Sequence, residues 1–249
     1  PRNSGQLGWL KIVHYSGVFH CFEGSSGINS HFGHLGFVQY FEVHYSGSDG
    51  WDETDGDSGV IVSQNTDEVK LQGITSKYNT VAFRLDRADD VEMLYNSMYC
   101  DGSALKVGLY IYGSKNLLVE GGEYTCAEDI GIHLLYGGNN ILKNLYVQGN
   151  EVGIKVDQST GNYFNDSYFT DNEEVGILLY GGDNNTVFNT DFNNEKYAIS
   201  FTREAENNTI REVDFSNTES YDIHHGFQSD STRNGWNNVL IDTDFDDLY

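Results

Sequence analysis

The sequence predicts an all-β protein, a right-handed single-stranded parallel β-helix, or solenoid, of about nine coils of about 22–24 residues. Two recurring markers carry this prediction. The first marker is a glycine or alanine followed by alternating apolar residues, at Gly108, Gly131, Gly153, Gly176 and Ala198. The second is an asparagine, at Asn116, Asn140, Asn162, Asn185 and Asn208. The two markers keep one period, which indicates a repeat architecture.

The period holds along most of the chain. Successive members of the first marker lie 23, 22, 23 and 22 residues apart. Upstream, Ala82 and Gly59 extend the series at intervals of 26 and 23 residues, and Asp222 follows Ala198 after 24 residues. Residues 59–249 therefore form regular repeats, and residues 1–58 form N-terminal coils that continue into them as one domain.

Each repeat holds three short stretches in which apolar residues alternate with polar ones, separated by Gly, Asn and Asp. This pattern predicts three strands and tight turns, without a helix. Each strand would pair with its counterpart one coil further on, about 4.8 Å away. We expect Ile132, Ile154, Ile177 and Ile199 to stack inside a right-handed coil, since parallel crossovers overwhelmingly take that hand.

The asparagine column has a physical role at the corners of such a coil. Stacked side-chain amides can hydrogen-bond along the axis, and asparagine tolerates the left-handed backbone of a sharp turn. Asparagines that act only as generic turn residues would predict the same fold.

Composition excludes some classes of function. The 249 residues include 38 Asp and Glu against 14 Lys and Arg, a formal net charge of −24, which disfavours nucleic acid and anionic membranes as partners. No apolar run reaches the length of a membrane span. The chain does not begin with Met and shows no signal peptide, so we expect a processed form or an internal segment of a larger surface protein.

The Gly-Ile starts and Asn-Asn corners resemble the right-handed parallel β-helix repeats of pectate-lyase-like and NosD-like proteins. Upstream, LGWLKIVHYSG (residues 7–17) and LGFVQYFEVHYSG (residues 35–47) resemble each other and strands of β-helical surface and lipoprotein domains. The resemblance implies the fold. It leaves the activity open, because the group includes lyases, hydrolases, epimerases, adhesins and tailspikes.

One predicted strand face combines cationic and aromatic side chains. GIHLLYGGNN (residues 131–140) and GILLYGGDNN (residues 176–185) differ by a one-residue slip that gives His133 an outward position after Ile132. Neighbouring coils place Arg84, Tyr110 and Lys155 at the same position. Asp86, Tyr112 and Asp157 lie two residues further on.

These side chains suit contact with a sugar polymer. Tyrosine stacks on sugar rings, arginine and lysine hold carboxylates, and histidine serves as a general base. If the protein is an enzyme, Lys155, His133 and Arg84 are the candidate catalytic residues, and Tyr110, Tyr112, Asp86 and Asp157 bind the substrate. The alternative is an ordinary solvated sheet face, since outward positions are polar in any exposed sheet.

Two N-terminal segments could bind metal ions. Five carboxylates occur within nine residues, at Asp49, Asp52, Glu53, Asp55 and Asp57. They predict a calcium (Ca²⁺) site, with a solvated acidic loop as the alternative, because the spacing is not that of an EF-hand. Five of the eight histidines lie early in the chain, at His14, His20, His31, His34 and His44. With Cys21, a loop holding His20, His31 and His34 could bind zinc or copper, although only two methionines argue against a copper carrier.

Cys100 and Cys126 lie 26 residues apart, which equals the interval from Ala82 to Gly108. They should therefore be neighbours on adjacent coils, within disulfide range. A disulfide and a pair of stacked buried thiols fit the sequence equally well.

Two classes of function follow. The first is an extracellular or cell-surface β-helix with a structural or adhesive role, which binds polysaccharide or neighbouring surface-protein subunits. The second is a carbohydrate-active enzyme, a polysaccharide lyase, glycoside hydrolase or epimerase, that works on the strand face.

Overall fold

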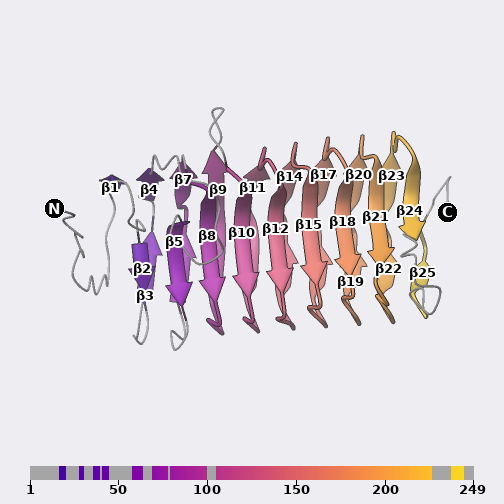
Figure 1. Cartoon of the computed structure of the whole chain (residues 1–249), viewed down its shortest axis with the longest axis horizontal. Helices are drawn as coiled ribbons and strands as arrows, with labels where there is room; N and C mark the ends of the chain where they lie inside the picture. Colours follow the sequence, from indigo (N-terminus) through magenta and orange to yellow (C-terminus); the bar gives the residue numbers. More distant parts are fainter. Residues whose placement is uncertain are drawn as a thin grey trace.

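The computed structural model describes residues 17–20, 28–30, 36–39, 41–44, 58–63, 69–77, 79–99, 105–225 and 237–243. In these residues the regular secondary structure is entirely β. The strands run across the long axis of the molecule, and each pairs in parallel with its neighbour further along that axis (Figure 1). The described part contains no helix long and apolar enough to cross a membrane. The predicted right-handed parallel β-helix is therefore confirmed.

One sheet has nine strands, of which the last seven each belong to one regular coil. In order along the axis they are β2 (Ile28–Ser30), β5 (Ser58–Ser63), β8 (Val81–Asp86), β10 (Val107–Tyr112), β12 (Ile130–Leu135), β15 (Val152–Asp157), β18 (Val175–Tyr180), β21 (Tyr197–Thr202) and β24 (Tyr221–His225).

The second sheet has 16 strands, and most regular coils contribute two short strands to it. Its main path runs through β1 (Gly17–His20), β4 (Phe41–His44), β7 (Thr75–Lys77), β9 (Glu92–Tyr99), β11 (Leu118–Thr125), β13 (Ile141–Lys143), β16 (Tyr163–Asn165), β19 (Thr186–Phe188), β22 (Thr209–Arg211) and β25 (Val239–Ile241). Beside this path lie β3 (Gly36–Gln39), β6 (Val69–Gln72), β14 (Tyr146–Gln148), β17 (Tyr168–Thr170), β20 (Asp191–Asn193) and β23 (Asp214–Ser216). The expected three strands per coil are found in the four coils that begin with β12, β15, β18 and β21, whereas β9 and β11 are each one long strand.

The predicted number of coils, about nine, was too high. The described residues form about seven regular turns, from β8 to β24. Further upstream the interval changes, because Ile28 pairs with Val60, which is 32 residues later in the chain. The repeat counted in the sequence therefore extends further than the regular coil does.

The interior is built from rows of stacked apolar side chains. Ile132, Ile154, Ile177 and Ile199 are in register and fully buried, as predicted. On the 16-stranded sheet, the rings of Phe169 and Phe192 stack with 4.8 Å between centroids. Burial of each such side chain contributes about 1.5–3 kcal/mol. The core is therefore repeated once per coil along the axis.

The glycine that precedes three of these isoleucines, all but Ile199, has a steric cause. A Cβ atom on Gly131 would lie 2.6 Å from the carbonyl oxygen of Gly153, and one on Gly153 would lie 2.5 Å from that of Gly176. Both distances are shorter than a carbon and an oxygen can approach. Close stacking of successive coils thus selects glycine at the first sequence marker.

The asparagines of each Asn-Asn corner divide two tasks. The second asparagine forms a ladder of amide hydrogen bonds at 2.8–3.1 Å, through Asn140, Asn162, Asn185, Asn208 and Asn238. The first four are buried and Asn238 is half-buried, and a glycine precedes Asn162. The first asparagine has a left-handed backbone, with φ between 55° and 64°, at Asn139, Asn184, Asn207 and Asn237. Asn116 belongs with this left-handed set, and Leu117 occupies the ladder position.

Candidate functional site

The four residues of the predicted outward column are neighbours in the nine-stranded sheet. Tyr110 is the register partner of Arg84 on one side and of His133 on the other, and His133 pairs with Lys155. Parallel strands lie about 4.8 Å apart, so each side chain is within reach of the next. We call the outward positions of β8 to β21, together with the corner residue that follows each strand, the outer face.

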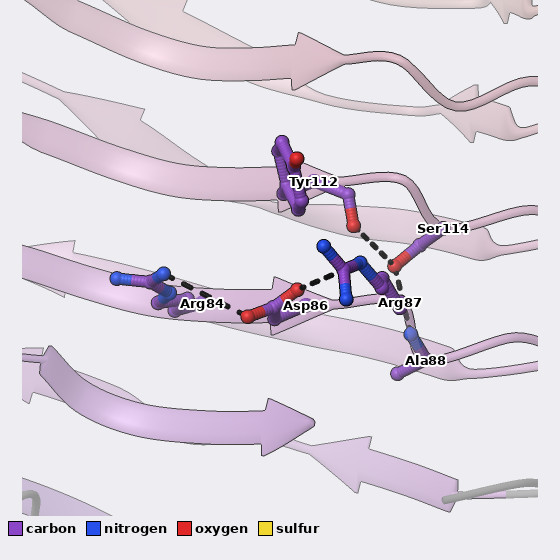
Figure 2. Close-up of polar contacts among 6 residues, drawn as sticks. All are labelled: Arg84, Asp86, Arg87, Ala88, Tyr112 and Ser114. Carbon is purple, nitrogen blue, oxygen red and sulfur yellow. Dashed lines mark hydrogen bonds and ion pairs between the residues drawn. The ribbon is translucent and has the colours of Figure 1, made fainter. Parts of the chain in front are cut away.

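The second predicted row is more widely spaced. Asp86 pairs with Tyr112, but Leu135 lies between Tyr112 and Asp157. Asp86 is flanked by two arginines: a nitrogen of Arg84 lies 3.7 Å from one carboxylate oxygen, and Nε of Arg87 lies 4.0 Å from the other (Figure 2). Lys155 lies 3.8 Å from Asp157. Both carboxylates therefore neutralise cations as well as offering acceptors to a ligand.

A serine of the adjacent coil fixes the corner that carries Arg87. The hydroxyl of Ser114 accepts a hydrogen bond of 3.0 Å from the backbone N–H of Ala88 and donates one of 3.3 Å to the carbonyl of Tyr112 (Figure 2). Ser114 is fully buried. The backbone under Arg87 and Tyr112 is thus held in place from below the outer face.

Tyr110 and His133 are much less accessible than an outward position suggests. Only 5% of Tyr110 and 7% of His133 is exposed. Tyr110 packs with Val81 and Val107, and its ring meets the imidazole of His133 edge-on at 5.4 Å. Arg84 lies over the other side of the Tyr110 ring, 5.5 Å from its centroid. A sugar ring cannot stack on Tyr110 in this arrangement.

His133 is a neutral imidazole at physiological pH. Burial and, to a smaller extent, the positive charge of Lys155 lower its pKa to about 4, while Asp157 acts in the opposite direction. Its buried Nε2 atom has no hydrogen-bond partner among the described residues. A buried nitrogen without a partner is costly in a folded protein, and it is the atom that could exchange a proton with a bound molecule.

A third row, of which only Tyr112 was predicted from the sequence, lies at the corner after each strand. The corner row consists of Arg87, Tyr136, Gln158 and Arg203, which have left-handed backbones, and of the strand-end tyrosines Tyr112 and Tyr180. Tyr136 is 52% exposed. The repeated Tyr-Gly pairs at residues 112, 136 and 180 were the available signal.

An arginine lies over a tyrosine ring at each end of the corner row. Arg87 lies 5.3 Å from the ring centroid of Tyr112, whose ring meets that of Tyr136 edge-on at 6.0 Å. The Tyr180 ring has Arg203 at 4.2 Å and Lys155 at 5.3 Å. The corner row is thus the accessible aromatic and cationic part of the outer face.

The predicted metal sites fall mostly outside the described residues. This applies to the whole acidic segment with Asp49, Asp52, Glu53, Asp55 and Asp57, and also to His14, Cys21, His31 and His34. His20 ends strand β1, so it does not belong to a loop, and it is in register with His44 of β4. Where the structure describes the chain, no three His, Cys, Asp or Glu side chains are grouped to hold a metal ion.

Cys126 is part of a disulfide bond. Its predicted partner, Cys100, lies outside the described residues. Of the two alternatives left open by the sequence, a disulfide and a buried free thiol, the first therefore applies to Cys126.

Comparison with known families identifies one matching model. Residues 39–200 and 108–244 match the family described as periplasmic copper-binding protein (NosD). A sequence search of curated proteins gives no significant match.

Several solved structures with the same fold are, by name, enzymes that act on alginate or mannuronan. The A-module of the mannuronan C-5 epimerase AlgE6 from Azotobacter vinelandii superposes with a TM-score of 0.63 at 16% identity, over 85% of this chain and 59% of that module. An alginate lyase from Paenibacillus sp. gives 0.58 at 11% identity, over 81% of this chain and 78% of the lyase. The periplasmic alginate epimerase AlgG gives 0.57 at 12% identity, over 91% and 74%. At these identities the likeness establishes the fold alone.

Proposed function

Because this chain belongs to the NosD family of parallel β-helix proteins, we propose that it works outside the cytoplasm and binds polysaccharide on its outer face. The role is structural or adhesive, with a sugar polymer as the partner, and neighbouring surface-protein subunits are the other partner class. NosD and AlgG are both described as periplasmic, which agrees with a place in the cell envelope or beyond it.

One observation carries the proposal: the outer face departs from the charge and composition of the rest of the chain. The chain has a formal net charge of −24. The outer face nevertheless holds four cations, Arg84, Arg87, Lys155 and Arg203, against two carboxylates, Asp86 and Asp157. Rings with a polar edge and long cationic side chains are the groups that recognise sugars.

The structural neighbours support this choice of ligand. An alginate lyase, a mannuronan epimerase and an alginate epimerase share the coil architecture, and each is named for a sugar polymer. A parallel β-helix offers such a polymer a flat, rigid and periodic surface.

The family description names copper, but the described residues contain no group of side chains that could hold a copper ion.

Calcium remains a proposal for the acidic segment with Asp49, Asp52, Glu53, Asp55 and Asp57. An ion that binds only the folded state raises its stability. The melting temperature should then be higher in millimolar calcium than in chelator, and the double variant Asp52→Asn with Asp55→Asn should abolish that difference. Equal melting temperatures for the unaltered protein would contradict the proposal.

Binding is tested with a panel of soluble polysaccharides and two tyrosine variants. Tyr112→Ala removes a half-buried ring from the outer face, whereas Tyr146→Ala removes a ring from the 16-stranded sheet that is partly exposed. We expect Tyr112→Ala to weaken binding about tenfold, the usual effect of losing one stacked ring, and Tyr146→Ala to leave affinity unchanged. Equal effects of the two substitutions would place the ligand elsewhere.

A second candidate function, a polysaccharide lyase or epimerase, is favoured by His133. A neutral imidazole with an unpartnered nitrogen can take a proton from a sugar carbon next to a carboxylate, and a cation such as Lys155 or Arg84 can hold that carboxylate. The burial of His133 argues against this function, since a substrate would have to displace the side chains that cover the imidazole.

The two functions differ in whether product forms. Incubation with uronic-acid polymers, followed by ultraviolet absorbance for unsaturated products and by NMR for epimerised sugars, tests for turnover. His133→Gln keeps a buried polar side chain of similar size. Product that forms with the unaltered protein and disappears in this variant and in Lys155→Ala would make the protein an enzyme. Binding without product in any variant fits the first proposal.

A further inference from the structure

We infer that the ligand of the outer face is a carboxylated polysaccharide, and that Arg87 and Arg203 of the corner row hold its carboxylates. This inference rests on the binding function proposed above and makes it more specific. The guanidinium group is the side chain best matched to a carboxylate, because its planar fork donates two parallel hydrogen bonds.

The corner row is a rigid and periodic part of the coil. The backbone N–H of Arg87 donates to the carbonyl of Tyr112 at 2.7 Å, and that of Tyr136 donates to the carbonyl of Asp157 at 3.1 Å. The parallel hydrogen-bond pattern therefore continues past the strand ends. Because β8 and β21 are five coils apart, Arg87 and Arg203 lie about 24 Å from each other along the axis. A polymer chain that runs along the axis can reach both arginines.

A glycine lies beside each arginine of this row. A Cβ atom on Gly113 would crowd Cγ of Arg87 at 3.2 Å, and one on Gly181 would be in ordinary contact with Cβ of Arg203 at 3.7 Å. Gly113 and Gly181 themselves have φ near 63°. Each arginine thus leans along the axis over a glycine, towards the tyrosine that precedes it.

Arg203 is positioned as a binding group by its ring contact. Its guanidinium lies 4.2 Å from the centroid of Tyr180, and it forms no ion pair with any residue in the described part of the chain. Stacking on a ring fixes the plane of a guanidinium and leaves its N–H groups directed outwards at the edge. Arg87 is similarly exposed, and the carboxylate that it pairs with among the described residues, Asp86, is at the 4.0 Å limit of an ion pair.

Charge decides between an anionic and a neutral ligand. A polyanion is repelled by a chain of net charge −24 unless the surface that it meets is locally positive. The outer face has two more cations than carboxylates, and Arg87 and Arg203 supply this excess. A neutral polysaccharide would need none of these groups, so they indicate a carboxylated one.

The test uses two oligosaccharides that differ only in charge: a six-unit oligouronate and the same oligomer with its carboxylates reduced to hydroxymethyl groups. Calorimetric titration gives the affinity of each. The variants are Arg203→Gln, Arg87→Gln and their combination. Arg211→Gln is the matched control, because Arg211 lies over the Phe188 ring at 4.4 Å but on the 16-stranded sheet.

We expect the unaltered protein and the control to bind the oligouronate at least tenfold more tightly than the reduced oligomer, and the double variant to lose this preference. Equal affinity for both oligomers, or a preference that survives in the double variant, would overturn the inference while leaving polysaccharide binding intact. If neither oligomer binds, the inference is wrong. The proposed function is wrong as well only if the neutral members of the polysaccharide panel also fail to bind.

Discussion

A single buried carboxyl group shows how the coil treats charge at the scale of one residue. Glu195 is fully buried and occupies the position of Asn150 and Asn172 in a second amide ladder, which was not predicted from the sequence. Its Oε1 accepts a hydrogen bond of 2.9 Å from Asn172, while Oε2 has no partner among the described residues. Burial raises the pKa of Glu195 to about 8, against the hydrogen bonds of Asn172, so the carboxyl is protonated at neutral pH.

Stability should therefore depend on pH through Glu195. The unfolded chain releases this proton near pH 4.5, but the folded protein keeps it up to about pH 8. Between these values the unfolded state binds fewer protons, so the free energy of unfolding falls as pH rises. Glu195→Gln keeps the acceptor oxygen and removes the titration. Thermal melts should give equal melting temperatures for the two proteins near pH 4 and a higher one for the variant at pH 9.

A variant that melts with the same pH dependence as the unaltered protein would contradict this assignment. Two other groups of the described part are strongly shifted: His133 lies on the outer face in a different coil and titrates at lower pH, and burial raises the pKa of the Tyr124 hydroxyl above its usual range. Neither group therefore obscures the comparison at pH 9.

Position and accessibility of the site residues were predictable to different degrees. The sequence placed Arg84, Tyr110, His133 and Lys155 at one register position, because the period of the repeat determines register. It could not predict that Tyr110 and His133 are buried, since that depends on how Val81, Val107 and neighbouring rings pack over the strands. Apart from Tyr112, the residues of the exposed corner row were not predicted, because the alternation of inward and outward residues ends where the strand ends.

At the scale of one structural element, the asparagine ladder is the device that keeps successive coils in register. The side-chain oxygen of Asn185 accepts hydrogen bonds from the backbone N–H and the side-chain amide of Asn162, at 2.9 and 2.8 Å. Its amide donates to Ser159 and Asn208 at 3.3 and 3.1 Å. The sequence predicted stacked amides, but not that the left-handed corner belongs to the preceding asparagine, because the two neighbours are chemically identical.

Asn185→Ala should be strongly destabilising, since it leaves buried donors of Asn162 and the carbonyl of Ser159 without partners. The expected loss is about 3 kcal/mol or more, the sum of several unsatisfied groups. Asn184→Gly, one residue earlier, is the control. It preserves the left-handed corner and should change stability by about 0.5 kcal/mol or less. Urea unfolding measures both, and a loss for Asn185→Ala no larger than that of the control would contradict the ladder's role.

At the scale of the whole molecule, repulsion among the carboxylates opposes folding. The net charge is −24, and like charges are adjacent in the sheet: Asp191 pairs with Asp214. Burial raises the pKa of Asp191, and the charge of Asp214 raises it further. A periodic fold repeats such contacts from coil to coil, so repulsion accumulates along the axis.

Salt should therefore stabilise the protein. Raising KCl from 0.01 to 1 M shortens the screening length from about 30 to about 3 Å. Each 1 kcal/mol of relieved repulsion should raise the melting temperature by about 2–4 °C for a chain of this size. KCl is preferable to sulfate, which stabilises proteins by another mechanism. A melting temperature that falls with added KCl would show that attractive ion pairs, such as Lys106 with Glu128, outweigh the repulsion.

The central claim, that the outer face binds polysaccharide, is tested most directly by hydroxyl-radical footprinting of tyrosines with and without saturating oligouronate. Tyrosines occur on both sheets, so each face reports on itself: Tyr112, Tyr136 and Tyr180 on the outer face, and Tyr146 and Tyr163 on the 16-stranded sheet. Our account predicts that ligand lowers the oxidation of Tyr136 and its two neighbours and leaves Tyr146 unchanged. Protection of Tyr146 with Tyr136 unaffected would contradict it.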